Sequence, residues 1–386
     1  MIRIDTSKID NWNTIKEKHI KFIEDIIKHD YEKYEKLPEE IRKYINENYK
    51  VIFTGKRKEM LEKAKVLRKL TFNNVCEYEL ELLEVFKSTK KNKRDTIIKE
   101  INEKFDKKEY ESYRKKLIDN INKIKHDKRI TSDYKKNFIS KYYPNYNIGL
   151  GNQENISQIF SYEKLTEGKE GWNRHELISR IGVKVCPYCN RQYISSYVEK
   201  NISKTTADLD HFYPKSRYPI LALSLYNFIP SCQVCNSRFK LDSDFYLQEH
   251  IYPYDECFDD YSYKFTTMPT QDGGIDYLTG DSNEFNLLIK CKGDNECNKV
   301  EKSIATFKLN ELYTEHKDYV REIIKKANLY NDDRINDIKD EFKLLFNSKE
   351  EVLRLIFSNY ISSEDLSKRP LSKLTKDICE EFEISI

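Results

Sequence analysis

The chain has 386 residues, of which 34% are charged and 38% hydrophobic, and its formal net charge at pH 7 is only +3. This length corresponds to two or three domains and is sufficient for a buried core. No apolar run approaches the ~20 residues of a membrane-spanning helix, and the N-terminus lacks a signal-peptide-like segment. These features argue against membrane and secreted classes, and we expect a cytoplasmic protein.

The N-terminal third has the periodicity of amphipathic helices. Apolar residues recur at three- and four-residue steps from Trp12 to Ile26, and His19 shares their face as an expected core histidine. Because there is no clear heptad register, we predict a helical bundle rather than a coiled coil. The segment 142–171, which begins with several turn-forming residues, is expected to be a linker.

Charge is unevenly divided along the chain. Residues 1–150 hold 37 basic and 26 acidic residues, whereas the remainder holds 31 and 39. Within the first part, Lys87 to Lys141 holds 19 basic and 9 acidic residues. Such a stretch can contact nucleic-acid phosphates, or it can be a solvated helix face. We therefore expect residues 1–150 to bind DNA, form an oligomer or dock a partner.

Glycine and proline are concentrated in the middle of the sequence. Of the 10 glycines and 9 prolines, 16 lie between Pro144 and Gly293. Since both residue types are unfavourable inside helices, this distribution predicts a loop-rich centre between two helical parts. The expected fold class is mainly α with a small α+β insert. The expected domains are a helical domain at 1–150, a central module at 171–293 and a C-terminal helical region at 294–386.

The C-terminal third returns to a roughly helical period. Apolar residues recur from Ile304 to Ile323, and His316 falls among them as a second expected core histidine. The sequence Arg-Pro-Leu-Ser-Lys-Leu at 369–374 then precedes a short predicted helix.

Four of the nine cysteines form two C-x-x-C pairs, Cys186 with Cys189 and Cys232 with Cys235. The odd total and the absence of a secretory signal favour reduced thiols or metal ligands over disulfides. Two such pairs supply four thiolates for a tetrahedral zinc ion. This site has no open coordination position, so the zinc is expected to be structural. A redox C-x-x-C would leave the second pair unexplained.

The other five cysteines give weaker signals. We expect Cys257, Cys291 and Cys297 to be free thiols, with a second metal site as the alternative. Cys76 and Cys379 lie in helical segments and are expected to be packed thiols.

Polar residues of an unusual kind lie between the two cysteine pairs. Two aspartates two residues apart are expected on one face of a short strand, which ends in a histidine. An asparagine follows in a loop before a second strand. A helix then carries an asparagine and a lysine four residues apart, and therefore on one face. These residues are Asp208, Asp210, His211, Asn227, Asn236 and Lys240.

This arrangement resembles the HNH endonucleases, whose core is the ββα-metal fold. The resemblance covers residues 186–240 and consists of two zinc knuckles, an Asp-His pair followed by proline, an intermediate asparagine and a final asparagine after the last cysteine. The sequences at 250–254 and 369–374 also look like those of bacterial HNH proteins from anti-phage defence systems, such as the nuclease subunit of Septu. The resemblance implies a ββα-metal HNH core flanked by N- and C-terminal helical regions.

The resemblance further implies a metal-dependent endonuclease that hydrolyses phosphodiester bonds, in DNA rather than RNA. His211 would be the general base, a task that the ordinary histidine pKa of ~6.5 suits. Asp210 and Asn236 would hold one Mg²⁺ or Mn²⁺ through oxygen ligands, with Asp208 as a supporting neighbour. Asn227 would hold the loop that orients His211. The expected nucleic-acid contacts are Lys215, Arg217, Arg238 and Lys240.

Two other functions fit the same sequence. The central module is alternatively a non-catalytic, zinc-stapled unit that binds nucleic acid or protein, or a staple within a helical scaffold. Because the chain has no P-loop, an ATPase or sensor that controls cleavage would be a separate subunit, and a homo-oligomer is also compatible with the sequence.

Overall fold

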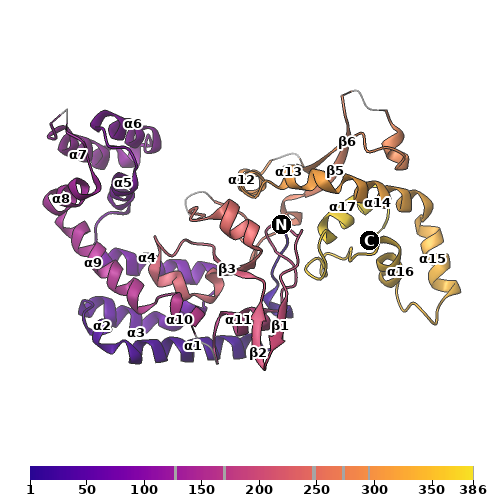
Figure 1. Ribbon diagram of the computed structural model, residues 1–386, viewed down its shortest axis with the longest axis horizontal. Helices are drawn as coiled ribbons and strands as arrows, with labels where there is room; N and C mark the ends of the chain where they lie inside the picture. Colours follow the sequence, from indigo (N-terminus) through magenta and orange to yellow (C-terminus); the bar gives the residue numbers. More distant parts are fainter. Residues whose placement is uncertain (126–127, 168–170, 246–248, 272–273, 294–295, 386) are drawn as a thin grey trace. The chain divides into compact units, whose positions relative to one another are not determined.

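The computed structural model of the chain describes residues 1–125, 128–167, 171–245, 249–271, 274–293 and 296–385 (Figure 1). These residues form mainly helices, with three small two-stranded sheets, in agreement with the expected fold class. None of the described helices is both long enough and apolar enough to cross a membrane.

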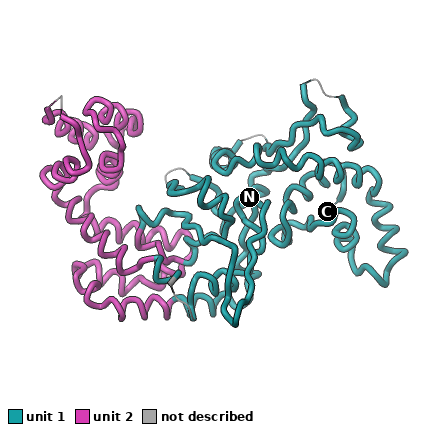
Figure 2. Tube along the Cα trace, viewed as in Figure 1, with its two compact units in different colours: residues 1–19, 162–218, 225–386 teal, residues 20–161, 219–224 magenta. Residues whose placement is uncertain are grey.

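The described chain divides into two compact units (Figure 2). Unit 1 consists of residues 1–19, 162–218 and 225–386, and unit 2 consists of residues 20–161 and 219–224. This division differs from the expected domains, because the first nineteen residues belong with the central and C-terminal parts. Their backbone explains why: the amide of Ile2 donates to the carbonyl of Pro187 at 3.0 Å, and that of Ile4 donates to the carbonyl of Pro253 at 2.7 Å.

Unit 2 is helical, as predicted for the N-terminal third. Buried residues between Phe72 and Tyr146 form one hydrophobic core of this unit. The ring centroids of Phe86 and Phe138 lie 5.0 Å apart within it. Helix α1 (Trp12–His29) begins in unit 1 and ends in unit 2. The other elements of unit 2 are α2 (Tyr31–Glu35), α3 (Glu39–Thr54), α4 (Arg57–Thr71), α5 (Glu77–Ser88), α6 (Arg94–Lys104), η2 (Lys108–Tyr110), α7 (Glu111–Asn122), α8 (Ser132–Tyr142), α9 (Pro144–Ile159) and η3 (Pro219–Leu223).

The segment expected to be a linker is largely helical, so that prediction is wrong. Pro144 stands at the first turn of α9, where its missing N–H costs nothing. Gly149 lies inside this helix because the chain passes very close to Phe72: a Cβ atom at this position would come within 2.8 Å of the Phe72 Cα. Pro144 therefore begins α9, and Gly149 allows the close contact of this helix with Phe72.

Unit 1 contains all the strands of the described chain. Three antiparallel pairs form, β1 with β2, β3 with β4 and β5 with β6. Their bounds are β1 (Ser196–Glu199), β2 (Ile202–Thr205), β3 (Asp208–His211), β4 (Phe228–Ser231), β5 (Tyr263–Pro269) and β6 (Phe285–Cys291). The helices and helical turns of unit 1 are η1 (Thr6–Lys8), α10 (Glu163–Glu167), α11 (Arg174–Ile181), η4 (Leu225–Asn227), the π-helical η5 (Cys235–Lys240), η6 (Asp259–Tyr261), η7 (Asp276–Thr279), α12 (Asn298–Thr306), α13 (Leu309–Tyr313), η8 (Thr314–His316), α14 (Lys317–Leu329), α15 (Asp332–Glu341), α16 (Lys349–Phe357) and α17 (Ser372–Glu381).

Helix α17, which follows the Arg-Pro-Leu-Ser-Lys-Leu sequence, is deeply buried. Lys373 and Asp377 are each 1% exposed and form an ion pair at 2.6 Å. The Lys373 ammonium also lies 2.6 Å from Asp259, and Asp377 accepts a hydrogen bond from the backbone of Phe265 in β5 at 2.9 Å. The charges of α17 are thus paired inside unit 1, which fixes this helix against the β5–β6 hairpin.

Asn190 links α17 to the first cysteine pair. Its side-chain oxygen accepts from the backbone N–H of Lys373 at 2.9 Å, and its amide donates to the carbonyl of Leu366 at 2.9 Å. The φ angle of Asn190 is +51°, a left-handed conformation that asparagine tolerates better than most residues. The residue directly after Cys189 therefore holds the start of the C-terminal helix.

The two expected core histidines differ. His19 is fully buried, and its Nδ1 accepts a hydrogen bond from the indole N–H of Trp172 at 3.0 Å. His316 is only half-buried and lies 3.2 Å from the Arg191 guanidinium nitrogen. The periodic apolar pattern therefore predicts the position of His19 correctly, whereas His316 lies at the edge of the core.

Candidate functional site

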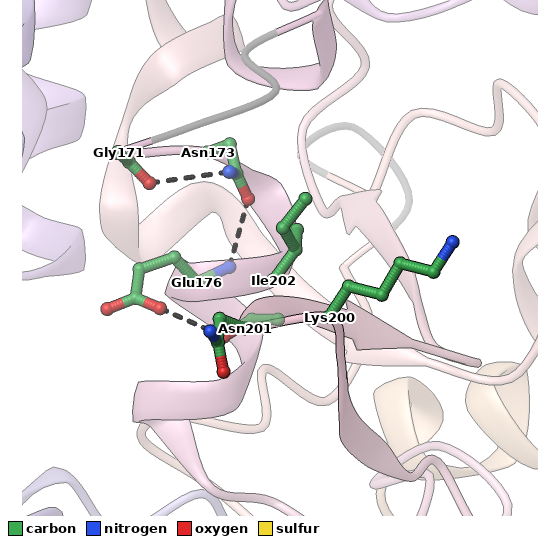
Figure 3. A pocket seen from close by; sticks show the side chains of 7 residues that line it. Gly171, Asn173, Glu176, Lys200, Asn201 and Ile202 are labelled. Carbon is green, nitrogen blue, oxygen red and sulfur yellow. Dashed lines mark hydrogen bonds between the residues drawn. The ribbon is translucent and has the colours of Figure 1, made fainter.

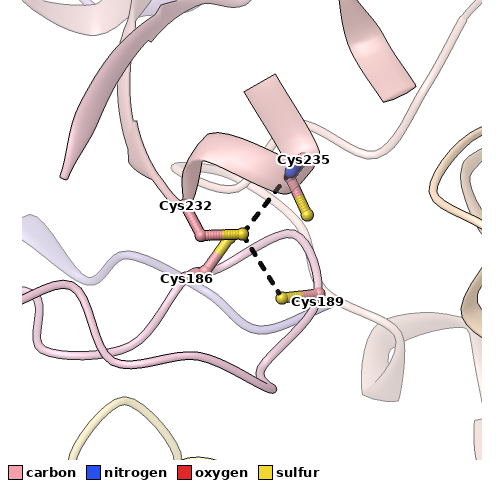
Figure 4. Close-up of side chains that lie close together, drawn as sticks. All are labelled: Cys186, Cys189, Cys232 and Cys235. Carbon is pink, nitrogen blue, oxygen red and sulfur yellow. Dashed lines mark hydrogen bonds between the residues drawn. The ribbon is translucent and has the colours of Figure 1, made fainter. Parts of the chain in front are cut away.

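The four cysteines of the two C-x-x-C pairs meet in one buried cluster (Figure 4). All four Sγ atoms lie within 4.8 Å of one another, and those of Cys189 and Cys232 are 3.9 Å apart. Tetrahedral zinc with Zn–S bonds of ~2.3 Å places its sulfur ligands ~3.8 Å apart. The cluster therefore fits a metal ion such as zinc. Among the described residues it is the one group of three or more metal-binding side chains that lie this close, and Cys257, Cys291 and Cys297 form no such group.

Backbone N–H groups are directed at the cysteine sulfurs. The amide of Arg191 donates to the Cys189 sulfur at 3.4 Å, and the amide of Cys235 donates to the Cys232 sulfur at 3.5 Å. The first pair lies in a tight turn in which the backbone N–H of Asn190 donates to the Cys186 carbonyl at 2.8 Å. Such donors stabilise negative charge on sulfur and so suit metal-bound thiolates.

Burial also affects the protonation of this cluster. It raises the pKa of the Cys186 thiol well above its ordinary value, because the thiolate is poorly solvated there. A bound divalent cation would reverse this preference, since metal-coordinated thiols are deprotonated. The donor set is thus suited to holding a cation.

The residues between the cysteine pairs form a hairpin followed by a helix. Strands β3 and β4 pair in antiparallel register, with Asp208 opposite Ser231 and His211 opposite Phe228. Cys232 follows β4, and Cys235 begins η5. This order of strand, loop, strand and helix agrees with the order that the sequence predicts, with the refinement that the helix is a π-helix.

His211 ends strand β3 and is half-buried among aromatic rings. Its imidazole makes edge contacts with Tyr162 and Phe228, whose ring centroids are 4.7 and 5.2 Å away. The loop after His211 is held by Asn227: its side-chain oxygen accepts from the amide of Tyr213 at 2.7 Å, and its side-chain nitrogen donates to the Tyr213 carbonyl at 3.0 Å. The buried Asn227 side chain thus fixes the backbone two residues beyond the histidine.

Asp210 is buried and already paired. It is 3% exposed, accepts a hydrogen bond from the Tyr188 hydroxyl at 2.5 Å and lies 3.1 Å from the Lys240 ammonium. Burial raises the pKa of Asp210, and the Lys240 and Tyr188 contacts oppose that rise. Sequence reasoning did not single out Tyr188, although its place inside the first cysteine pair was a signal that it would be held near the cluster.

Lys240 does not contact solvent, which corrects its expected role at a phosphate. Its side chain is 1% exposed, and its ammonium group donates to the His211 carbonyl at 2.6 Å in addition to its ion pair with Asp210. An ammonium with these two partners cannot reach a bound nucleic acid without leaving them. In this structure Lys240 is an internal counter-ion.

Asn236 lies against Asp208 rather than Asp210. Its side-chain amide donates to the Asp208 carboxylate at 3.0 Å, and both residues are half-buried. The two aspartates of β3 each meet a residue of η5, so the predicted shared faces are present. The pairs are Asp208 with Asn236 and Asp210 with Lys240, and the expected combination of Asp210 and Asn236 at one metal is not assembled here.

The other expected nucleic-acid contacts lie in different environments. Lys215 is exposed and pairs with Glu163 at 2.9 Å. Arg217 is half-buried and pairs with Asp244 at 3.1 Å. Arg238 is exposed on η5. Lys215 and Arg238 are therefore accessible, whereas Arg217 is engaged within the fold.

A pocket of about 270 Å³ lies beside the β1–β2 hairpin (Figure 3). Asn173 closes the start of α11 there, because its side-chain oxygen accepts from the amide of Glu176 at 3.1 Å. The Glu176 carboxylate in turn accepts from the Ser203 hydroxyl at 3.1 Å. The lining residues are Gly171, Asn173, Glu176, Lys200, Asn201, Ile202 and Ser203, so this pocket contains none of the site residues predicted from the sequence.

The buried pair of Asp210 and Lys240 gives a stability prediction. We expect Lys240→Met to lower the free energy of unfolding by about 3–5 kcal/mol, because it leaves the Asp210 carboxylate buried without its cation. The double variant Lys240→Met/Asp210→Asn should recover most of this loss, since no charge then remains. Urea denaturation measures both, and equal stability of the single and double variants would contradict the prediction.

Comparison of the chain with protein-family models, curated proteins and solved structures finds no match.

Proposed function

We propose that the chain is a metal-dependent HNH-type endonuclease that hydrolyses phosphodiester bonds in DNA. The observation that carries this proposal is that one hairpin and helix, linked to the four-cysteine cluster, carry an imidazole, a carboxylate and an amide. His211 ends β3, Asp208 begins it, and Asn236 from η5 donates to Asp208 at 3.0 Å. These are the residue types that phosphodiester hydrolysis with a bound divalent ion requires.

In this proposal His211 accepts a proton from the attacking water as general base. The rings of Tyr162 and Phe228 hold the imidazole by its edges, and Asn227 fixes the backbone after it. A bound Mg²⁺ or Mn²⁺ would supply charge stabilisation at the scissile phosphate. Asp208 and Asn236 offer half-buried oxygen ligands for it, and Asp210 becomes a third only if it parts from Lys240.

The zinc ion that we assign to the four cysteines has a structural role in this proposal. Four thiolates leave zinc no open position for water or substrate. The wider context, an effector of bacterial anti-phage defence controlled by a separate ATPase or sensor subunit, rests on the sequence resemblance alone.

A second candidate function is a non-catalytic, zinc-stapled binding module. The ion pair between Asp210 and Lys240 favours it, because that contact occupies the carboxylate expected to bind the catalytic metal. Under this alternative the module binds nucleic acid or protein and cuts nothing.

The test is incubation of the purified chain with supercoiled plasmid DNA in the presence of Mg²⁺, Mn²⁺ or no added divalent ion. We expect nicked and linear products with Mg²⁺ or Mn²⁺ only, and about one zinc per chain by elemental analysis. Intact plasmid under every condition, including with proteins encoded beside the chain's own gene, would overturn the nuclease proposal, and absence of zinc would overturn the structural zinc site.

A further inference from the structure

Lysine and arginine gather in the last two helices of the basic segment of unit 2. Between Arg114 and Lys141 the sequence has ten basic and three acidic residues. Lys135 is buried and donates to the Thr89 carbonyl, so it belongs to the fold. The exposed basic residues of this stretch are Lys115, Lys116, Lys123, Lys125, Lys128, Arg129, Lys136 and Lys141.

Four of these lysines lie over tyrosine rings that are anchored in the core of unit 2, and the first of them is Lys116, whose ammonium group lies 5.1 Å from the centroid of the Tyr143 ring. The ammonium groups of Lys123 and Lys141 lie 5.2 and 5.1 Å from the centroid of the same ring, that of Tyr142. The ammonium group of Lys128 lies 4.6 Å from the centroid of the Tyr134 ring. The rings of Tyr134 and Tyr142 are partly buried and pack against the core, which holds them in place beneath the lysines.

Three of these four lysines have no acidic partner in the described part of the chain. No ion pair joins Lys123, Lys128 or Lys141 to a described carboxylate, whereas Lys116 pairs with Glu79 at 2.7 Å. The cation–π contacts limit where each ammonium can move without neutralising it. All three lysines are also exposed, so an external anion can approach them.

The positions of the two rings spread this charge along one helix. Tyr134 lies in the first turn of α8 and Tyr142 is its last residue, which separates them by about 12 Å along the helix axis. Lys123 comes from the end of α7 and Lys128 from the segment between the helices. An extended polyanion with regularly spaced charges fits such a row better than a small anion does.

We propose that Lys123, Lys128 and Lys141, with Tyr134 and Tyr142, form a surface that binds the phosphate backbone of nucleic acid. The choice of nucleic acid among polyanions rests on the proposed function, whereas the polyanion site rests on unit 2 alone. Lysines hold phosphates as point charges and read no base sequence. The expected binding is therefore independent of sequence and sensitive to salt.

The test compares two triple charge reversals by fluorescence anisotropy of labelled 30-nucleotide DNA, single-stranded and duplex, without added divalent ions. One variant is Lys123→Glu/Lys128→Glu/Lys141→Glu. Its matched control is Lys43→Glu/Lys58→Glu/Lys69→Glu, which changes the net charge equally at exposed lysines of α3 and α4. A third variant, with glutamine at positions 123, 128 and 141, removes the charge without reversing it.

We expect the first variant to weaken binding about 10- to 100-fold and to reduce the slope of log affinity against log salt by about two to three, as lost phosphate contacts do. The glutamine variant should show a smaller loss, and the control should stay within about threefold of the wild type. Equal losses in the first variant and the control, or no binding by the wild type, would overturn the proposal. A chain that binds DNA through these lysines but cuts no plasmid would contradict the nuclease proposal and support this one.

Discussion

Replacing Cys232 with serine should release the bound metal and destabilise unit 1. The serine hydroxyl is a poor zinc ligand, and three remaining cysteines hold zinc much less tightly than four. Because metal binding is coupled to folding, the loss appears as lower stability. At about 2–4 °C per kcal/mol for a domain of this size, we expect the midpoint of thermal unfolding to fall by about 10 °C or more, with near-zero zinc content.

Cys297→Ser is the matched control for this experiment. Cys297 is a half-buried cysteine of the same unit that lies outside the four-cysteine cluster. We expect this variant to keep its zinc and its unfolding midpoint. Zinc retained at the wild-type level by Cys232→Ser, or lost equally by both variants, would show that the cluster does not hold the metal.

Replacing His211 with alanine should remove cleavage while leaving DNA binding intact. A positioned general base contributes about 10²–10⁴-fold to the rate of such a reaction, and alanine supplies no proton acceptor. The first-order rate of loss of supercoiled plasmid with Mn²⁺ measures the effect. Since the basic surface of unit 2 does not involve His211, anisotropy with labelled DNA should give the same affinity as the wild type.

His29→Ala is the control for this variant. His29 is exposed at the last turn of α1, and its loss should leave the cleavage rate within about twofold of the wild type. A contaminating nuclease would make the His211→Ala preparation as active as the control. Equal activity of the two variants would therefore show that the observed cleavage does not depend on His211, and in a preparation free of contaminating nuclease it would reject His211 as the general base.

The parts of the fold that the sequence predicts are those that depend on local pattern. The two cysteines of each C-x-x-C pair lie close together because each pair folds as a tight turn. Strand β3 and the buried face of α1 follow from short-range periodicity. The prediction of a linker at 142–171 is wrong because proline and glycine also occur in helices, proline at the first turn and glycine at close contacts. Only the close approach of Phe72 to Gly149, about 80 residues apart in sequence, shows that this glycine belongs to a packed helix.

The sequence predicts which residues lie in the candidate site, but it does not predict which of them contact one another. Period two in β3 and the four-residue spacing in η5 correctly predict which residues share a face. Which aspartate meets which residue depends on how η5 packs across β3, and no local signal specifies that offset. The burial of Lys240 likewise depends on Asp210 and the His211 carbonyl, 29 or more residues earlier in the chain.

The region around Asn190 makes contacts with parts of the chain that are synthesised much later, and these contacts limit when the region can fold. Its partner Lys373 lies 183 residues later, and Cys189 in front of it accepts a hydrogen bond from Tyr313, 124 residues later. Contacts across such distances form only after the intervening chain has been made and ordered, which slows their formation. While the ribosome is still translating, the first cysteine pair therefore lacks its C-terminal support. The cluster gains that support only after Lys373 has emerged from the ribosome.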